Sequence, residues 1–243
     1  YASMVEGMDA SLGQVLDKLD ELKVAEDTII MFSSDNGGLS YGARGKTPRD
    51  TGRNTHCWPL KAGKGSAYEG GTRVPMIVSW ARPNSGNPHQ KKIPIAAASI
   101  CDTPNICEDY YPTLCNWAGI SDLLAGREDI DGRDLTADVT GKAPKVTQPF
   151  LFHYPHVWGP RGPGYEPHSS IRLGDWKAIY FYQPKRWELY NLKDDLGEVK
   201  NMAIIHPERL KELSDRMKIE HDRRDAQYPA NRETKEPEPP LWR

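Results

Sequence analysis

The chain has 243 residues, of which 37% are hydrophobic and 20 are prolines, and its formal net charge is −2. This length can bury a sizeable core in one large domain or two smaller ones, and the prolines predict many loops. The small net charge argues against general binding to nucleic acid or to a membrane surface, and no apolar run reaches the roughly 18 residues of a membrane-spanning helix.

The first predicted element is a helix over residues 4–22, where apolar side chains recur every three or four positions on one face. The apolar run at 28–32 predicts a buried strand, which ends in the sequence S-S-D-N-G-G at 33–38. Helix, strand and loop in this order indicate an α/β architecture. In a parallel sheet of that kind, ligands bind at the carboxyl ends of the strands, so the loop at 33–38 is the first candidate for a site.

Asp35 and Asn36 carry the kind of side-chain oxygen that a hard divalent cation binds, and the two glycines behind them let the backbone turn closely. The same residues are also typical of a plain turn. From this loop to the start of a second glycine-rich stretch at 61–75, basic residues far outnumber acidic ones. They are Arg44, Lys46, Arg49, Arg53, Lys61 and Lys64, against only Asp50. A cation beside this local excess of positive charge indicates an anionic substrate.

The four cysteines, at positions 57, 101, 107 and 115, fit no metal-binding spacing. Cys101 and Cys107 could pair across a loop or remain free thiols. We expect Cys57 to be a loop or buried thiol without a catalytic role.

The rest of the chain reads as short strands and helices. We expect strands at 74–80 and 93–99, a surface turn at 81–92, a helix at 109–119 and a polar boundary at 141–149. Beyond the boundary, apolar runs at 150–154, 170–173, 177–182 and 187–192 predict a small antiparallel sheet. A helix that begins at Pro207 should pack on this sheet through Leu210, Leu213 and Met217, and the proline-rich tail at 229–243 should be extended.

The sequence S-D-N-G-G at 34–38, followed by K-A-G-K-G-S-A-Y-E-G-G-T-R-V-P at 61–75, resembles the carboxyl-terminal half of type I sulfatases in the alkaline-phosphatase-like superfamily. D-G-R-D-L at 131–135, I-R-L-G-D-W-K at 171–177 and E-L-Y-N-L-K-D-D at 188–195 extend the resemblance over almost the whole chain. It implies an α/β fold: residues 1–145 would form the carboxyl-terminal part of an α/β/α sandwich, and residues 146–243 a small α+β subdomain with an antiparallel sheet.

The resemblance also implies a function, as part of a calcium-dependent sulfatase that hydrolyses the sulfate ester of a carbohydrate or an aryl alcohol. Asp35 and Asn36 would bind the calcium ion, and Lys64 would be a catalytic, substrate-binding cation on the sulfate or leaving oxygen. His153 and His156 would contact the substrate, although a histidine at the end of an edge strand is more often structural.

The family's nucleophile is a formylglycine in the amino-terminal half. That half is expected to be missing here, since the sequence opens at Tyr1 inside a helical pattern. The chain alone should therefore be inactive and bind calcium poorly, because calcium takes about six to eight oxygen ligands.

Two other functions remain open. One is a phosphodiesterase or phosphonate hydrolase of the same superfamily, and the other is a non-catalytic, anion-binding homologue. The resemblance further implies a periplasmic or secreted protein. The sequence does not identify the sulfated substrate.

Overall fold

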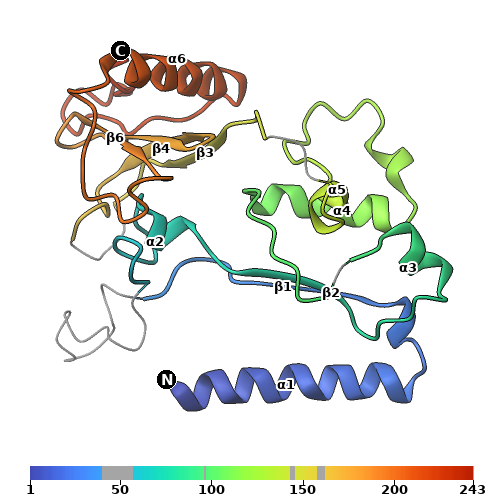
Figure 1. Ribbon diagram of the computed structural model, residues 1–243. Helices are drawn as coiled ribbons and strands as arrows, with labels where there is room; N and C mark the ends of the chain where they lie inside the picture. Colours follow the sequence, from blue (N-terminus) through green and yellow to red (C-terminus); the bar gives the residue numbers. More distant parts are fainter. Residues whose placement is uncertain (40–56, 96, 143–145, 158–161, 243) are drawn as a thin grey trace. The chain divides into compact units, whose positions relative to one another are not determined.

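The computed structural model describes residues 1–39, 57–95, 97–142, 146–157 and 162–242 (Figure 1). The segment that carries Arg44, Lys46, Arg49 and Arg53 lies outside these residues. The chain forms two compact units. The carboxyl-terminal unit consists of Ser34–Pro75 and Thr147–Arg243, with Tyr1, and the amino-terminal unit consists of Ala2–Ser33 and Met76–Val146.

The amino-terminal unit combines one long helix, a two-stranded sheet and several short helices. Its elements are α1 (Ala2–Glu21), β1 (Ile29–Ser33), β2 (Met76–Trp80), α3 (Pro88–Lys92), α4 (Tyr110–Trp117) and α5 (Thr136–Val139), with short 3-10 turns at Ala25–Asp27, Cys107–Asp109 and Ser121–Leu124. The predicted helices at 4–22 and 109–119 are thus confirmed. Gly119, at φ +72°, follows the end of α4, where a left-handed residue favours glycine.

Two expectations for this unit are wrong. β1 and β2 pair antiparallel, with Phe32 opposite Ile77, rather than in the parallel arrangement from which we placed the site at a strand end. The expected strand at 93–99 is also not formed by the described residues of that stretch. The expected turn before it contains helix α3 instead, because the Asn87 side chain accepts hydrogen bonds from the backbone N–H groups of His89 and Gln90, and Pro88 occupies the first turn.

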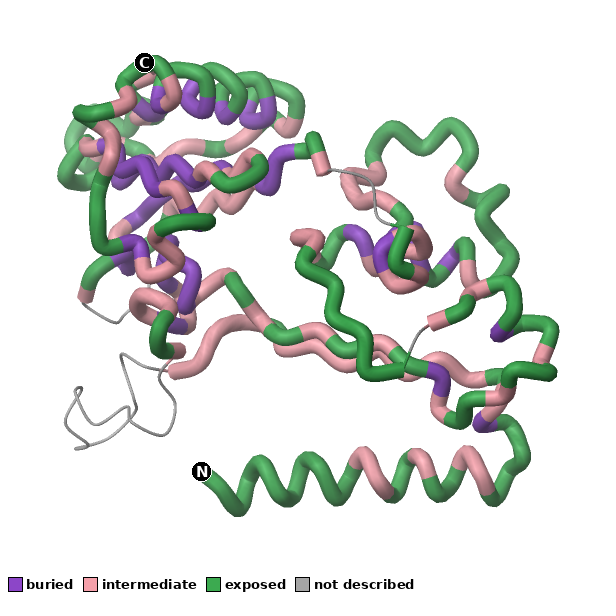
Figure 2. The backbone as a smooth tube through the Cα atoms, in the orientation of Figure 1, coloured by how far each residue is buried: buried purple, intermediate pink, exposed green. Residues whose placement is uncertain are grey.

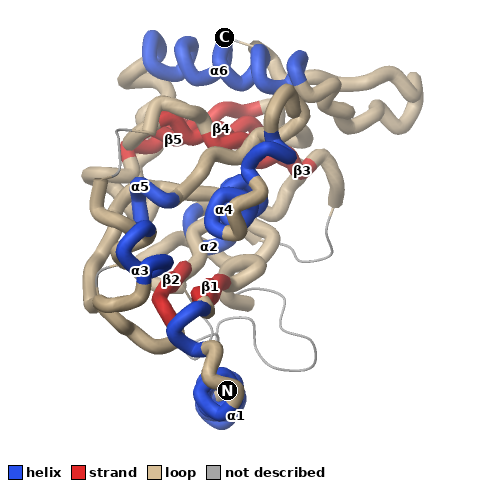
Figure 3. The backbone as a smooth tube through the Cα atoms, turned by 90° about the vertical axis from the view of Figure 1, so that its right-hand side faces the viewer, coloured by secondary structure: helices blue, strands red, loops and turns tan. Residues whose placement is uncertain are grey.

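The carboxyl-terminal unit is built on a four-stranded sheet. Its strands, β3 (Phe150–Tyr154), β4 (His168–Leu173), β5 (Trp176–Phe181) and β6 (Arg186–Asn191), lie in sequence order and are all antiparallel. Helix α6 (Pro207–Arg223) lies along one face of this sheet (Figures 1 and 3). The predicted antiparallel sheet and the helix that begins at Pro207 are therefore confirmed.

Both faces of this sheet are buried, as the purple segments in Figure 2 show. On one face, Ile171, Tyr180 and Leu189 form a core with Leu210, Leu213 and Met217 of α6. On the other face, alternate residues of the same strands pack against the glycine-rich stretch that contains α2 (Glu69–Thr72). They are Ile179, Phe181, Tyr190 and the adjoining Leu192, in contact with Ala67 and Tyr68. The two-residue period of strand side chains thus places α2 and α6 on opposite faces of one sheet.

The described part of the tail, residues 229–242, has no helix, as expected, and its regular pairing is the bridge between Ala230 and Pro237. The tail returns to the core because the Trp187 indole N–H donates to the carbonyl of Leu241 at 2.7 Å. No described helix combines the length and the apolar character needed to cross a membrane.

Candidate functional site

The turn that follows β1 is held by its own backbone. The N–H of Ser34 donates to the carbonyl of Pro75 at 3.4 Å, and the N–H of Gly37 donates to the carbonyl of Gly71 at 3.1 Å. The Ser34 hydroxyl donates to the carbonyl of Asn36 at 2.9 Å. These contacts tighten the turn while the Asp35 side chain is exposed and Asn36 is half-buried.

Gly37 allows this turn to lie directly against α2, and Gly70 and Gly71 allow α2 to lie directly against the residues just before it. A Cβ atom on Gly37 would be 1.7 Å from the carbonyl oxygen of Gly70, and one on Gly71 would be 2.3 Å from the carbonyl oxygen of Ser66. A Cβ atom on Gly70 would be 2.4 Å from the carbonyl oxygen of Lys61. Since all three contacts are with backbone, no side-chain movement could relieve them. The glycine of the first motif is thus required by the approach of the turn to α2, and the two glycines of the second motif by the folding of their own stretch.

Lys64 lies beside the same turn. Its backbone N–H donates to the carbonyl of Gly38 at 2.9 Å, although the two residues are far apart in the sequence. The structure therefore brings the Asp35–Asn36 turn and the Lys64 loop together through their main chains. Cys57 reaches this place as well, because its sulfur accepts a hydrogen bond from the Gly38 N–H at 3.2 Å. The sequence did not predict this contact of Cys57, which fits its expected role as a loop thiol.

Other residues of the glycine-rich stretch hold it on the sheet. The Lys61 ammonium lies 3.7 Å from the centre of the Tyr68 ring and donates to the carbonyl of Glu198 at 3.0 Å. Burial lowers the pKa of Lys61. Lys61, which we counted in the local excess of positive charge, thus has partners within the protein for its ammonium group. The hydroxyls of Tyr68 and Tyr190 both donate to Glu188 at 2.8 Å.

A buried ion cluster joins α2 to the sheet. The Lys177 ammonium lies 2.9 Å from Oε1 of Glu69 and 3.0 Å from Oε1 of Glu198. Burial alone would raise the pKa of Glu69, but Lys177, and after it Arg172 and Arg73, bring this pKa below its ordinary value. Burial raises the pKa of Glu198, and Lys177 offsets this only in part. Sequence reasoning missed this cluster, since nothing local marks a charged residue as buried.

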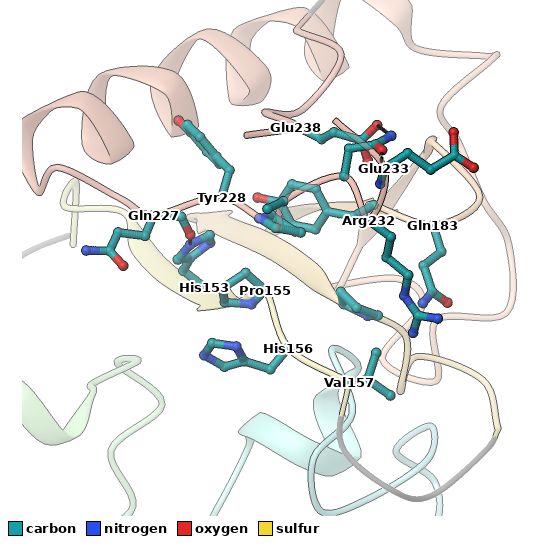
Figure 4. A pocket seen from close by; sticks show the side chains of 15 residues that line it. His153, Pro155, His156, Val157, Gln183, Gln227, Tyr228, Arg232, Glu233 and Glu238 are labelled. Atoms are coloured by element: carbon teal, nitrogen blue, oxygen red, sulfur yellow. Dashed lines mark hydrogen bonds between the residues drawn. The ribbon is translucent and has the colours of Figure 1, made fainter. Parts of the chain in front are cut away.

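The two candidate histidines lie in one pocket of about 940 Å³ at the end of β3, together with the segment 227–233 (Figure 4). His153 is engaged on both sides of its ring: Nε2 lies 2.8 Å from the carbonyl of Gln227, and Nδ1 lies 2.7 Å from the Ser169 hydroxyl. Burial lowers the pKa of His153, so the neutral ring donates through Nε2 and accepts through Nδ1.

His156 is exposed, and its ring packs edge-on against Tyr154 at 5.7 Å. The described residues that line this pocket do not include Asp35, Asn36 or Lys64. Contact of either histidine with the substrate stays a prediction.

The chemistry of the turn suits a hard cation only in part. A carboxylate and an amide from neighbouring residues supply oxygen donors of the type that calcium prefers. In the part of the chain that the structure describes, no group of three or more His, Cys, Asp or Glu side chains could hold a metal ion. Asp35 and Asn36 therefore fit as two ligands of a larger set, and the metal site stays a prediction.

Comparison with known proteins identifies relatives over most of the chain. The model of the family described as Sulfatase matches residues 1–120, and the model described as N-sulphoglucosamine sulphohydrolase, C-terminal, matches residues 62–227. Steryl-sulfatase of Homo sapiens is 36% identical over 181 residues, which are 74% of this chain and 28% of that protein. A sulfatase of Formosa agariphila is 32% identical over 226 residues, which are 85% of this chain and 36% of that protein.

Solved structures agree with these relatives. The crystal structure of Ps i-CgsB in complex with k-i-k-neocarrahexaose superimposes with a TM-score of 0.69 and 26% identity, and covers 96% of this chain and 45% of that one. The chain thus spans about a quarter to a half of the length of the proteins that it matches.

Proposed function

Because the chain belongs to the type I sulfatases of the alkaline-phosphatase-like superfamily, we propose that the protein hydrolyses sulfate esters and that the Asp35–Lys64 region is part of its active site. The observation that carries the proposal is the hydrogen bond of 2.9 Å from the Lys64 N–H to the Gly38 carbonyl, which joins the two family motifs in one place. Asp35 and Asn36 are far from Lys64 in the sequence. The hydrogen bond is what places their two loops side by side, so that their side chains could act on one substrate.

The reaction needs fixed positive charge more than a proton relay. As the bond from sulfur to the leaving oxygen breaks, negative charge grows on that oxygen and on the sulfuryl oxygens. The Lys64 ammonium would stabilise this charge by donating to the sulfate or leaving oxygen. A calcium ion held by Asp35 and Asn36 would, when bound, add positive charge at the sulfate oxygens. The backbone contacts of Gly37 and Gly38 keep these groups in place before the substrate arrives.

The remaining parts of the proposal concern residues outside this sequence and the substrate. A formylglycine from the amino-terminal half would supply the nucleophile, and that half would complete the calcium site. The complex of Ps i-CgsB with k-i-k-neocarrahexaose supports a carbohydrate as substrate. The proposal of a sulfated carbohydrate, and of a periplasmic or secreted location, rests on family resemblance.

The test is an assay of the full-length protein, produced together with a formylglycine-generating enzyme. Release of inorganic sulfate is measured from 4-nitrophenyl sulfate and from a panel of sulfated oligosaccharides. Hydrolysis of the matching 4-nitrophenyl phosphate diester and phosphonate ester is measured as release of 4-nitrophenol. We expect sulfate release that stops when calcium is chelated and returns when calcium is added. Faster hydrolysis of the phosphorus esters would instead favour a phosphodiesterase or phosphonate hydrolase. Calcium-binding protein that hydrolyses none of them would favour a non-catalytic homologue.

A further inference from the structure

We propose that Lys177 is a positioning residue for the active site: by binding Glu69 and Glu198 together, it holds α2 where the Asp35–Asn36 turn and Lys64 require it. The inference rests on the proposed sulfatase function and extends it, because it makes the carboxyl-terminal sheet part of the machinery that orders the active site. Lys177 itself touches none of the residues proposed to contact the substrate among the contacts described above.

Lys177 occupies a position on the buried face of the sheet, where the alternation of side chains along β5 favours an apolar residue. It lies on β5 on the same face as Ile179 and Phe181, and only 1% of it is exposed. An ammonium at such a position is costly unless it is paired. Here it is paired twice, with Oε1 of Glu69 at 2.9 Å and with Oε1 of Glu198 at 3.0 Å. Both carboxylates are buried as well, so each of the three charges depends on the others.

Glu198 fixes the glycine-rich stretch at two points. Its Oε2 accepts a hydrogen bond of 2.6 Å from the backbone N–H of Glu69, the first residue of α2. Its backbone carbonyl accepts the Lys61 ammonium at 3.0 Å. The Lys61 carbonyl in turn accepts the N–H of Gly70 at 2.9 Å. Lys61 and Glu69, which lie on either side of Lys64 in the sequence, are therefore both attached to Glu198, the residue whose carboxylate pairs with Lys177.

From α2 the connection to the active-site turn is purely backbone. Gly71 accepts the N–H of Gly37 at 3.1 Å, and Gly38 accepts the N–H of Lys64 at 2.9 Å. The two backbones also lie close together here, since a Cβ atom on Gly37 would be 1.7 Å from the carbonyl oxygen of Gly70. Through these hydrogen bonds we expect a displacement of α2 to displace the turn, and a misplacement of about 1 Å can reduce a rate by about 100-fold.

Loss of the ammonium would change the charge state as well as the packing. Glu69 and Glu198 would face each other with no cation between them, and two carboxylates that share a buried site cannot both stay ionised. Arg172 and Arg73 each lie 3.7 Å from Oε2 of Glu69 and would still favour its ionised form. Glu198 would therefore take up the proton. Removing its charge should compensate for the loss of Lys177.

The experiment compares four forms of the full-length protein with the unchanged protein: Lys177→Met, Glu198→Gln, the double variant of both, and Lys185→Met as control. Lys185 forms an ion pair of 3.4 Å with Glu238 at the surface, so its replacement removes a lysine of the same subdomain without touching α2. The readouts are kcat and KM for 4-nitrophenyl sulfate between pH 5.5 and 8.5, and backbone hydrogen exchange in peptides that cover 34–38, 61–72 and α6.

For Lys177→Met we expect kcat at pH 7.5 to fall at least 10-fold with KM changed less than twofold, and hydrogen exchange to accelerate at least 10-fold at 34–38 and 61–72 but not in α6. The loss of kcat should become smaller as the pH falls and Glu198 is protonated. The double variant should recover kcat to within about threefold of Glu198→Gln, and Lys185→Met should behave like the unchanged protein.

Three results would overturn the inference: unchanged kcat and exchange in Lys177→Met, equal acceleration in α6 and in 61–72, or a double variant no better than Lys177→Met. If Lys177→Met does not fold, Glu198→Gln tests the inference in its place. We then expect kcat to fall and hydrogen exchange to accelerate only at 34–38 and 61–72. No change in either quantity would overturn the inference. If the protein without substitutions has no sulfatase activity, the proposed function is refuted. The hydrogen-exchange data would still test whether Lys177 positions α2.

Discussion

Replacing Gly37 with alanine tests whether the approach of the two motifs is needed for activity. The Cβ atom of alanine would lie 1.7 Å from the carbonyl oxygen of Gly70, whereas real Cβ atoms keep at least 3.0 Å from such neighbours. The turn and α2 must then separate by more than about 1 Å, because both partners of the contact are backbone. Overpacking of this kind costs about 1–3 kcal/mol, and the accompanying misplacement of Asp35 and Lys64 should reduce kcat/KM by about 100-fold.

The assay is kcat/KM of the full-length protein on a sulfate ester, together with its thermal midpoint and its affinity for calcium. Gly86→Ala is the matched control, because the added Cβ there meets only the side-chain oxygen of Asn84, at 3.1 Å, which can move. Gly37→Ala with the activity and calcium affinity of the unchanged protein would refute the argument that the turn and α2 must touch. An equal loss in Gly86→Ala would show that the effect is not specific to the turn.

Three further predictions concern single side chains. Lys64→Ala should lower kcat by about 100- to 1,000-fold, as the loss of one stabilising contact at the transition state does, with little change in thermal midpoint; a raised KM at unchanged kcat would show ground-state binding instead. Asp35→Ala should weaken calcium binding by about 10-fold or more in calorimetric titration, and equal affinity would exclude Asp35 as a ligand. Burial, and next to it the neighbouring His153, lowers the pKa of His221 from 6.5 to about 4. The folded state therefore favours the neutral ring. Its contribution to stability is complete above about pH 6.5 and is lost as the pH falls towards 4, by at most about 3 kcal/mol and less where water screens the ring. Urea unfolding against pH should show this slope in the unchanged protein and a flatter one in His221→Phe.

The local elements of this protein follow from local patterns. The helical period at 4–22 and at 207–223, and the spaced apolar runs between 150 and 192, predicted α1, α6 and the antiparallel sheet, since side-chain periodicity is a property of neighbouring residues. The prediction for the stretch at 81–99 was wrong because local patterns there conflict. An apolar run looks like a strand, whereas the Asn87 cap and Pro88 begin a helix just before it.

For the candidate site too, the sequence predicted the local features and the tertiary structure decided the long-range contacts. The candidate residues at 35, 36 and 64 were chosen from the sequence because a carboxylate, an amide and an ammonium beside glycines form a local pattern, and their roles stay predictions. The tertiary structure alone shows that these loops meet and that the Lys61 ammonium binds the Glu198 carbonyl. It also pairs Lys177 with Glu69, 108 positions away in the sequence. Pairing and burial depend on residues that are distant along the chain, and the environment that makes a charge buried does not exist until the sheet and α2 have come together.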